Sequence, residues 1–186
     1  MRHGRTDMND KKLIVGSIDD PINETGRSQA AAATSYFNEG INRIVSSPLS
    51  RAKETAKIVG SALNVGVEVD SRLRERCVGG YYEGKPEFPG MLEKFLEEEM
   101  PTPGAEPLSA FRERVFDALR SATDQPTKIL LVTHALPLLV MLGKIKGWSL
   151  AEILDYDVPP NCVPLKFYFG THCAECGGKF YEPKSD

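Results

Sequence analysis

The sequence lacks any long apolar run. No segment of its 186 residues approaches the roughly 18 to 20 consecutive apolar residues that a membrane-spanning helix needs, and the N-terminus has no apolar core of a secretory signal. We therefore expect a soluble, cytoplasmic protein that has no membrane partner.

The chain also lacks a strong excess of charge of one sign. Its formal net charge is −3, and no block of five or six like charges suggests a basic arm. Nucleic acid is therefore not an expected partner. An anionic ligand would have to be held by a local basic pocket.

Cysteines are few and unevenly placed, which argues against a disulfide framework and favours reduced thiols. Cys173 and Cys176 form a Cys-x-x-Cys turn after His172, in a Cys-containing tail over about residues 170–186. A structural zinc ion needs four ligands, and this segment supplies at most three. A hairpin or tail with a Gly-Gly turn is the favoured interpretation, and a zinc ion shared between subunits or a redox pair is the alternative.

Short apolar and β-branched runs predict the strands of an α/β fold. The predicted strands are 44–45, 65–69, 129–132 and the alternating Val163, Leu165, Phe167 and Phe169, and the predicted helices are 25–38, 49–63, 107–122 and 136–145. Strands that alternate with helices of this length imply a three-layer α/β/α sandwich with a mainly parallel central sheet. We expect one domain over residues 1–186, in which the stretch 79–106 is a candidate lid.

Charged and nucleophilic side chains follow the predicted strands. Arg51 opens a helix beyond strand 44–45, His134 comes two residues after strand 129–132, and Arg2 and His3 stand at the start of the chain. In open α/β sheets, ligands bind beyond the carboxyl ends of the strands. If the strands are neighbours, two histidines and two arginines meet at one edge of the sheet.

These segments carry a resemblance to a known family. The stretch Arg2-His3-Gly4, residues 46–56 and the stretch Val132-Thr133-His134 resemble the three signatures of the histidine phosphatase superfamily, whose fold is phosphoglycerate mutase-like. Supporting matches are Asn9, the stretch 19–30 and the acid-bearing stretch Leu73-Arg74-Glu75. The occurrence of all these motifs in the family's order makes the resemblance specific, and the resemblance covers the chain through about residue 161.

The resemblance implies a mechanism and a set of roles. His3 is expected to attack phosphorus, and Glu75 is expected to protonate the leaving oxygen and then activate water. Two arginines and the second histidine are expected to surround the phosphoryl oxygens, and Asn9 is expected to face the substrate; the predicted catalytic residues are thus His3, Glu75 and His134, and the substrate-binding residues are Arg2, Asn9 and Arg51. The cationic cluster is expected to replace a metal ion, so neither a metal nor another cofactor is predicted.

The start of the chain departs from the family pattern. In the family an apolar strand precedes Arg-His-Gly, whereas here that motif begins at the second residue. Either the start codon is placed too late or the gene is truncated. A chain that begins at Met1 is expected to lose several kcal/mol of stability together with the anchored backbone of His3, and to have weak or no activity.

The expected activity is hydrolysis of a small-molecule phosphomonoester through a phosphohistidine on His3. A mutase-type phosphotransferase is the first alternative, although the short chain and its Glu83-Gly84-Lys85 element resemble the phosphatase branch. The second alternative is a degenerate member that binds phosphorylated ligands without turnover, a possibility raised by the missing strand and by Ala135, where the family usually has glycine. The sequence names neither the physiological substrate nor the oligomeric state.

Overall fold

The fold is built around a short parallel sheet. The computed structural model describes residues 1–37, 40–124 and 127–167. Strand β1 (Arg43–Ser46) lies between β2 (Val67–Val69) and β3 (Ile129–Val132), and both neighbours run parallel to it. Ser46 pairs in register with Val69 and with Val132, so the three strands end at one edge.

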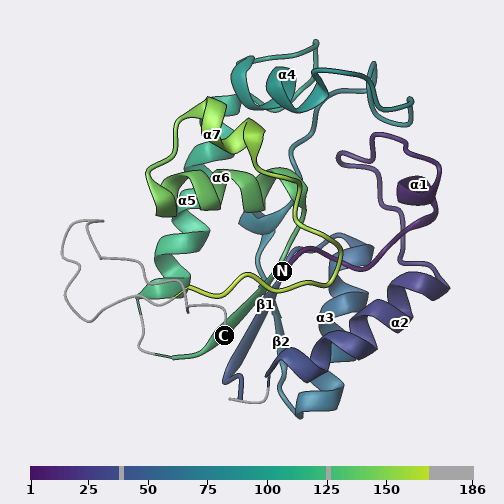
Figure 1. Cartoon of the computed structure of the whole chain (residues 1–186), viewed down its shortest axis with the longest axis vertical. Helices are drawn as coiled ribbons and strands as arrows, with labels where there is room; N and C mark the ends of the chain where they lie inside the picture. Colours follow the sequence, from purple (N-terminus) through teal and green to yellow (C-terminus); the bar gives the residue numbers. More distant parts are fainter. Residues whose placement is uncertain (38–39, 125–126, 168–186) are drawn as a thin grey trace.

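Helices cover both faces of this sheet (Figure 1). Helices α2 (Glu24–Ala32) and α3 (Ser50–Leu63) and the 3-10 helix η1 (Ala33–Phe37) lie on one face. Helices α5 (Leu108–Thr123) and α6 (Ala135–Lys146) lie on the other, and α7 (Leu150–Asp155) packs against α6. The predicted three-layer α/β/α class with a parallel sheet is confirmed.

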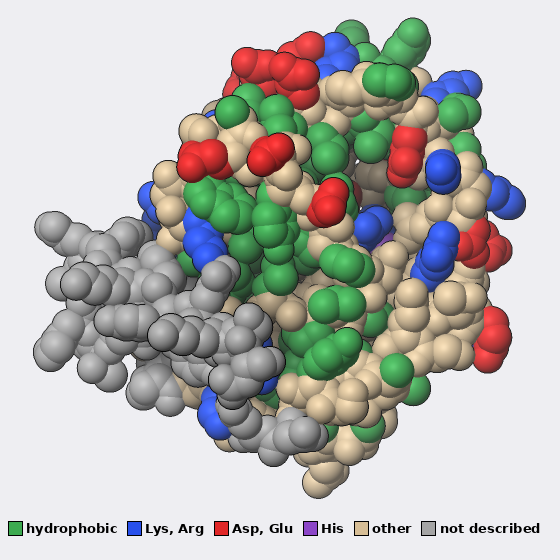
Figure 2. All heavy atoms as spheres, in the orientation of Figure 1, with side chains coloured by type: hydrophobic (Ala, Val, Ile, Leu, Met, Phe, Trp, Pro, Cys, Tyr) green, Lys and Arg blue, Asp and Glu red, His purple; other side chains and the backbone are tan. Residues whose placement is uncertain are grey.

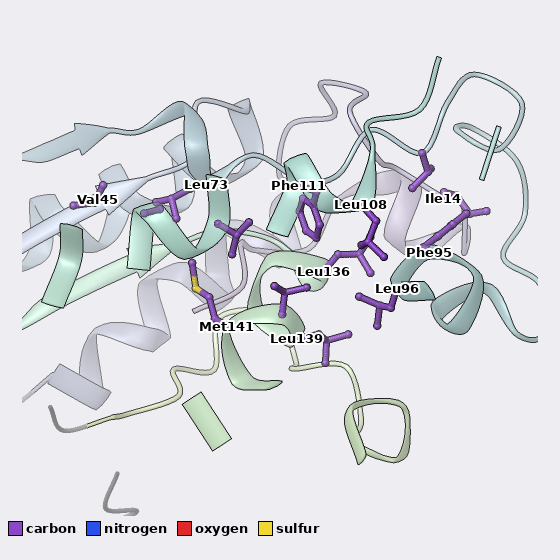
Figure 3. Close-up of a cluster of buried hydrophobic side chains, with 14 residues drawn as sticks. Ile14, Val45, Leu73, Phe95, Leu96, Leu108, Phe111, Leu136, Leu139 and Met141 are labelled. Atoms are coloured by element: carbon purple, nitrogen blue, oxygen red, sulfur yellow. The ribbon is translucent and has the colours of Figure 1, made fainter. Parts of the chain in front are cut away.

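The two faces of the sheet have separate apolar cores because successive side chains of a strand point in opposite directions. Ile44 belongs to the cluster under α2 and α3, and the next residue, Val45, belongs to the cluster under α5 and α6. Figure 3 shows the second cluster, where Phe111 of α5 lies near Leu136 and Leu139 of α6. Burial on both faces explains why the sequences of β1 and β3 contain apolar runs without polar alternation, whereas the more exposed β2 alternates Val-Glu-Val.

Three of the predicted strands are present, and the fourth is not. Residues 163–167 form no strand, and Phe169 lies outside the described residues. Pro159, Pro160 and Pro164 lack the N–H groups that a sheet requires, and Cys162 has a positive φ of 59°. The backbone therefore turns at 159–162, and the alternation of apolar residues does not produce a strand there.

The predicted helix 25–38 is present with a change, and the role of the stretch 79–106 as a lid stays a prediction. The helix expected over 25–38 is the α-helix α2 followed by η1, and the residues after Phe37 lie outside the described part. The stretch 79–106 contains a helix, α4 (Met91–Glu97), whose side chains Phe95 and Leu96 are buried. The Cys-containing tail of 170–186 lies outside the described residues.

The start of the chain lies against the carboxyl end of β3. Arg2 forms parallel bridges with both Thr133 and Asn161, and the backbone N–H of His3 donates to Thr133 O at 3.0 Å. The side chain of Asn161 donates to His3 O at 2.7 Å. The expectation that His3 would lose its anchored backbone is therefore wrong, because two segments hold it.

A short helix, α1 (Asp7–Asp10), follows this anchored start and is capped by Thr6. Within the described ranges, no helix has the length and apolar content required to cross a membrane.

Candidate active site

The parallel sheet brings the predicted residues together. Because β1 and β3 are neighbours and end in register, Arg51 at the start of α3 lies next to His134, which follows β3. His3 lies beside the same strand end, and its ring centroid is 5.1 Å from that of His134. Figure 2 shows histidine atoms at the bottom of a recess, next to a basic side chain.

His3 is held as a neutral ring, and its second nitrogen, Nε2, has no hydrogen-bond partner among the described residues. Its Nδ1 lies 2.7 Å from the carbonyl oxygen of Gly4, which can only accept, so Nδ1 carries the proton. Burial lowers the pKa of His3 well below its ordinary value, and the charges of Arg51 and Arg2 lower it further. The Nε2 lone pair of this buried ring is therefore available for attack on an electrophile.

His134 is fixed in the same neutral state by different partners. The Nε–H of Arg51 donates to Nδ1 of His134 at 3.1 Å, and a guanidinium nitrogen can only donate. The proton of the ring is therefore on Nε2, which donates to Ser47 Oγ at 2.7 Å. Burial, followed by the charge of Arg51, lowers the pKa of His134 well below its ordinary value.

Arg51 is buried and is oriented by a loop. Its two terminal nitrogens donate to Ile18 O at 2.7 Å and to Gly16 O at 2.9 Å. Together with the bond to His134, these contacts use three of the five N–H groups of the guanidinium. The remaining two N–H groups can bind an anion.

Arg2 supplies a second cation. Its NH1 donates to Pro159 O at 3.3 Å, and its Nε is buried without a hydrogen-bond partner in the described part of the chain. A buried guanidinium with an unused donor is well suited to bind an oxyanion, because each unsatisfied buried donor carries a cost that an anion removes.

Glu75 stands at the edge of this cationic cluster. Its carboxylate oxygens accept from Arg76 N at 3.0 Å and from Leu136 N, in the first turn of α6, at 3.4 Å. Burial raises the pKa of Glu75, although these two N–H groups and the charges of Arg51 and Arg2 oppose the shift. A raised pKa favours the protonated form of the carboxyl group, which is the form that can act as a general acid.

Comparison with known proteins identifies the family. A sequence model of the histidine phosphatase superfamily (branch 1) matches residues 1–172. The chain belongs to this superfamily. It is 31% identical over 157 residues to a probable phosphoglycerate mutase, GpmB, of Salmonella paratyphi B, which covers 79% of this chain and 73% of that protein.

Solved structures of the superfamily have the same fold. A mycobacterial glucosyl-3-phosphoglycerate phosphatase is 27% identical, with a TM-score of 0.73, over 87% of this chain and 85% of that one. Bacillus stearothermophilus YhfR gives a TM-score of 0.81 at 24% identity, over 97% of this chain and 91% of its own. The second likeness concerns the fold alone.

Of the six predicted site residues, five are linked by the contacts and charge interactions described above, and Asn9 has different hydrogen-bond partners. Asn9 belongs to the capping box of α1, where its side-chain oxygen accepts from Thr6 N at 3.3 Å. Within the described residues, no hydrogen bond joins Asn9 to the other five. The predicted contact of Asn9 with substrate stays a prediction.

The glycine of Arg-His-Gly is required by close contact between two backbone segments. A Cβ atom at Gly4 would lie 2.6 Å from Gly26 O, and one at Gly26 would lie 2.2 Å from Arg5 O. Two backbone segments therefore meet at these glycines, and neither position has room for a side chain. This contact fixes the loop that carries His3 against the start of α2.

Sequence reasoning missed the residues that orient the reactive ones. Ser47 accepts from His134, the buried hydroxyl of Thr55 accepts from Gly4 N at 2.8 Å, and Asn161 holds His3 O. Ser47 and Thr55 belong to the second family signature, and Asn161 lies at the end of the resemblance seen in the sequence, so all three positions could have been singled out from the sequence. Their partners are 51 to 158 residues away in the sequence.

Proposed function

We propose that this histidine phosphatase is a metal-independent hydrolase of small phosphomonoesters that works through a phosphohistidine on His3. The observation that carries the proposal is the neutral His3 ring, whose Nδ1 is bound to Gly4 O and whose Nε2 is free. A nucleophile of this kind must be unprotonated and held in one tautomer, and both conditions are met before substrate arrives.

In the first step, Nε2 of His3 attacks phosphorus in line, a P–N bond forms and the bond from phosphorus to the leaving oxygen breaks. The protonated carboxyl group of Glu75 gives its proton to that oxygen, so the alcohol leaves neutral. Its raised pKa supports this role.

In the second step, water attacks the phosphohistidine. The carboxylate of Glu75 takes a proton from the water, a P–O bond forms, the P–N bond breaks and inorganic phosphate is released. Glu75 is then protonated and His3 neutral, as at the start, so the cycle balances in atoms and charge.

The cations of the site act on the transferring group. Arg2 has a buried unused Nε, and Arg51 has two unused N–H groups; both are placed to bind phosphoryl oxygens. His134 joins them if its Nε2–H moves from Ser47 Oγ to a phosphoryl oxygen. This fixed positive charge is the reason that we expect activity without a metal ion.

A mutase-type transfer is the second candidate, favoured by the 31% identical relative whose name is probable phosphoglycerate mutase. The two activities share the phosphohistidine and differ in the acceptor, which is water in one case and a second alcohol in the other. We favour hydrolysis because the 27% identical solved neighbour is named a phosphatase and because of the Glu83-Gly84-Lys85 element.

The test is hydrolysis of an aryl phosphate in EDTA, combined with trapping of phosphoenzyme by acid-free quenching. Wild-type protein should turn over and carry an acid-labile phosphoryl group, and His3→Gln should lose both. His172→Ala removes the third histidine of the chain and should retain both. Turnover that persists in folded His3→Gln refutes the nucleophile, and labelling without hydrolysis until an alcohol is added favours the mutase.

A further inference from the structure

The lid segment contributes a carboxylate that contacts no residue of the candidate active site directly. Glu83 follows Tyr82 in the stretch 79–106, and its Oε1 accepts from Ser17 N at 3.0 Å and from Val78 N at 3.1 Å. Its Oε2 accepts from the hydroxyl of Ser17 at 2.7 Å. The Glu83 carboxylate thus joins the candidate lid to Ser17 by accepting two hydrogen bonds, and its third hydrogen bond holds Val78, the residue just before the candidate lid.

The loop held by Glu83 is the one that orients Arg51. Gly16 and Ile18, on either side of Ser17, provide the two carbonyl oxygens to which Arg51 donates at 2.9 and 2.7 Å. Gly16 has a φ of +50°, and a Cβ there would lie 2.4 Å from the Glu83 carboxylate. The carboxylate therefore packs directly against the backbone that faces the guanidinium.

The backbones of the same two segments are also paired. Ile14 N donates to Lys85 O and Gly84 N donates to Ile14 O, each at 2.8 Å, and Glu87 N donates to Lys12 O at 2.9 Å. Three backbone hydrogen bonds therefore join the candidate lid to the loop, in addition to the side-chain contacts of Glu83.

We propose that Glu83 is a positioning residue that links the lid to Arg51 through the carbonyl groups of Gly16 and Ile18. This inference rests on the proposed phosphoryl-transfer function and deepens it. With the loop held, two N–H groups of Arg51 are presented to the phosphoryl group. With the loop released, the guanidinium loses two fixed acceptors and rotates away from the orientation that the transition state requires.

The proposal makes a specific distinction between two substitutions. Glu83→Gln keeps a carbonyl oxygen for the N–H groups of Ser17 and Val78, and its amide can donate to the Ser17 hydroxyl. Glu83→Ala removes all three contacts. We expect Glu83→Ala to lower kcat for an aryl phosphate by about tenfold or more, and Glu83→Gln to keep at least about a third of wild-type kcat.

A double-mutant cycle with Arg51→Lys tests the route of the effect. If Glu83 acts through Arg51, Glu83→Ala should change kcat/KM by less than about threefold in the Arg51→Lys background. Vanadate, which imitates the five-coordinate transition state, should bind Glu83→Ala about tenfold more weakly than wild type while KM changes by less than about threefold. Glu97→Ala, an exposed carboxylate on α4, serves as the matched control and should leave all these values unchanged.

The possible results distinguish a failure of the Glu83 positioning role from a failure of the proposed phosphatase function. If Glu83→Gln and Glu83→Ala lower kcat equally, the charge of Glu83 matters and the positioning role is wrong. The positioning role is also wrong if Glu83→Ala lowers kcat/KM by the same factor with Arg51 and with Arg51→Lys. If the wild-type protein turns over and is labelled on His3, but Glu83→Ala is fully active, only the role of Glu83 is overturned. Absence of turnover and labelling in folded wild-type protein overturns the proposed function itself.

Discussion

Replacing Thr55 by valine tests whether one buried hydroxyl holds the loop that carries His3. Thr55 is fully buried in α3; its Oγ1 donates to Arg51 O at 2.7 Å and accepts from Gly4 N at 2.8 Å. Valine keeps the volume and removes the acceptor, so the Gly4 N–H is left buried without a partner. An unsatisfied buried donor costs about 1–3 kcal/mol, so we expect the free energy of unfolding to fall by about 2 kcal/mol.

The same substitution should reduce activity. The carbonyl oxygen of Gly4 fixes the tautomer of His3, and a Gly4 peptide that turns to find another acceptor moves this oxygen. We expect kcat to fall by about tenfold, because small displacements of a nucleophile are costly.

Urea unfolding and aryl phosphate kinetics on the same preparations measure both effects of Thr55→Val. Thr34→Val is the control, since its hydroxyl donates to Ala31 O at an exposed site, and it should change stability by less than about 0.5 kcal/mol. If Thr55→Val unfolds at the same urea concentration as the control and turns over at the wild-type rate, the hydroxyl does not hold the loop.

Three further predictions follow from the charged groups. The hydrolysis rate should rise with pH as His3 becomes neutral and should fall at higher pH as Glu75 loses its proton. Glu75→Gln should lower kcat, and its pH–rate profile should lack the fall in rate at higher pH. The pKa values of His3 and His134 are lower in the folded chain than in the unfolded one, so stability present above pH about 6.5 should be lost as the pH falls, by up to about 1.4 kcal/mol per unit for each ring. The measurement is the free energy of unfolding as a function of pH, which should fall less steeply with decreasing pH in His3→Gln than in the wild-type protein. Arg76 is buried, and among the described residues its side chain donates only to backbone carbonyl groups of the candidate lid, 79–106. Arg76→Leu should therefore cost about 3 kcal/mol or more in urea unfolding, and a change below about 1 kcal/mol contradicts that role.

The sequence predicted most of the fold because the strands and helices have distinct apolar periods. The runs at 44–45 and 129–132 are buried on both faces, and such runs belong to parallel strands covered by helices. The prediction failed at 163–167, where the alternation was present but the prolines and a positive φ at Cys162 prevent the regular hydrogen bonds of a strand. Side-chain period alone does not report which backbone groups are available for pairing.

By itself, the sequence determined the chemical types at the site: two histidines, two arginines and a carboxyl group that follow strands or open the chain. The convergence of Arg51 and His134 required only that β1 and β3 be parallel neighbours, which the α/β pattern implied. The start of the chain needed further contacts, with Thr133 and Asn161. The tautomers, the neutral state of both rings and the orientation of Arg51 were decided by tertiary structure alone. Each of these properties depends on burial or on a hydrogen-bond acceptor that is distant in the sequence, such as Ser47 or the carbonyl group of Gly16. Such a hydrogen bond exists only when the folded backbone brings the two groups within about 3 Å.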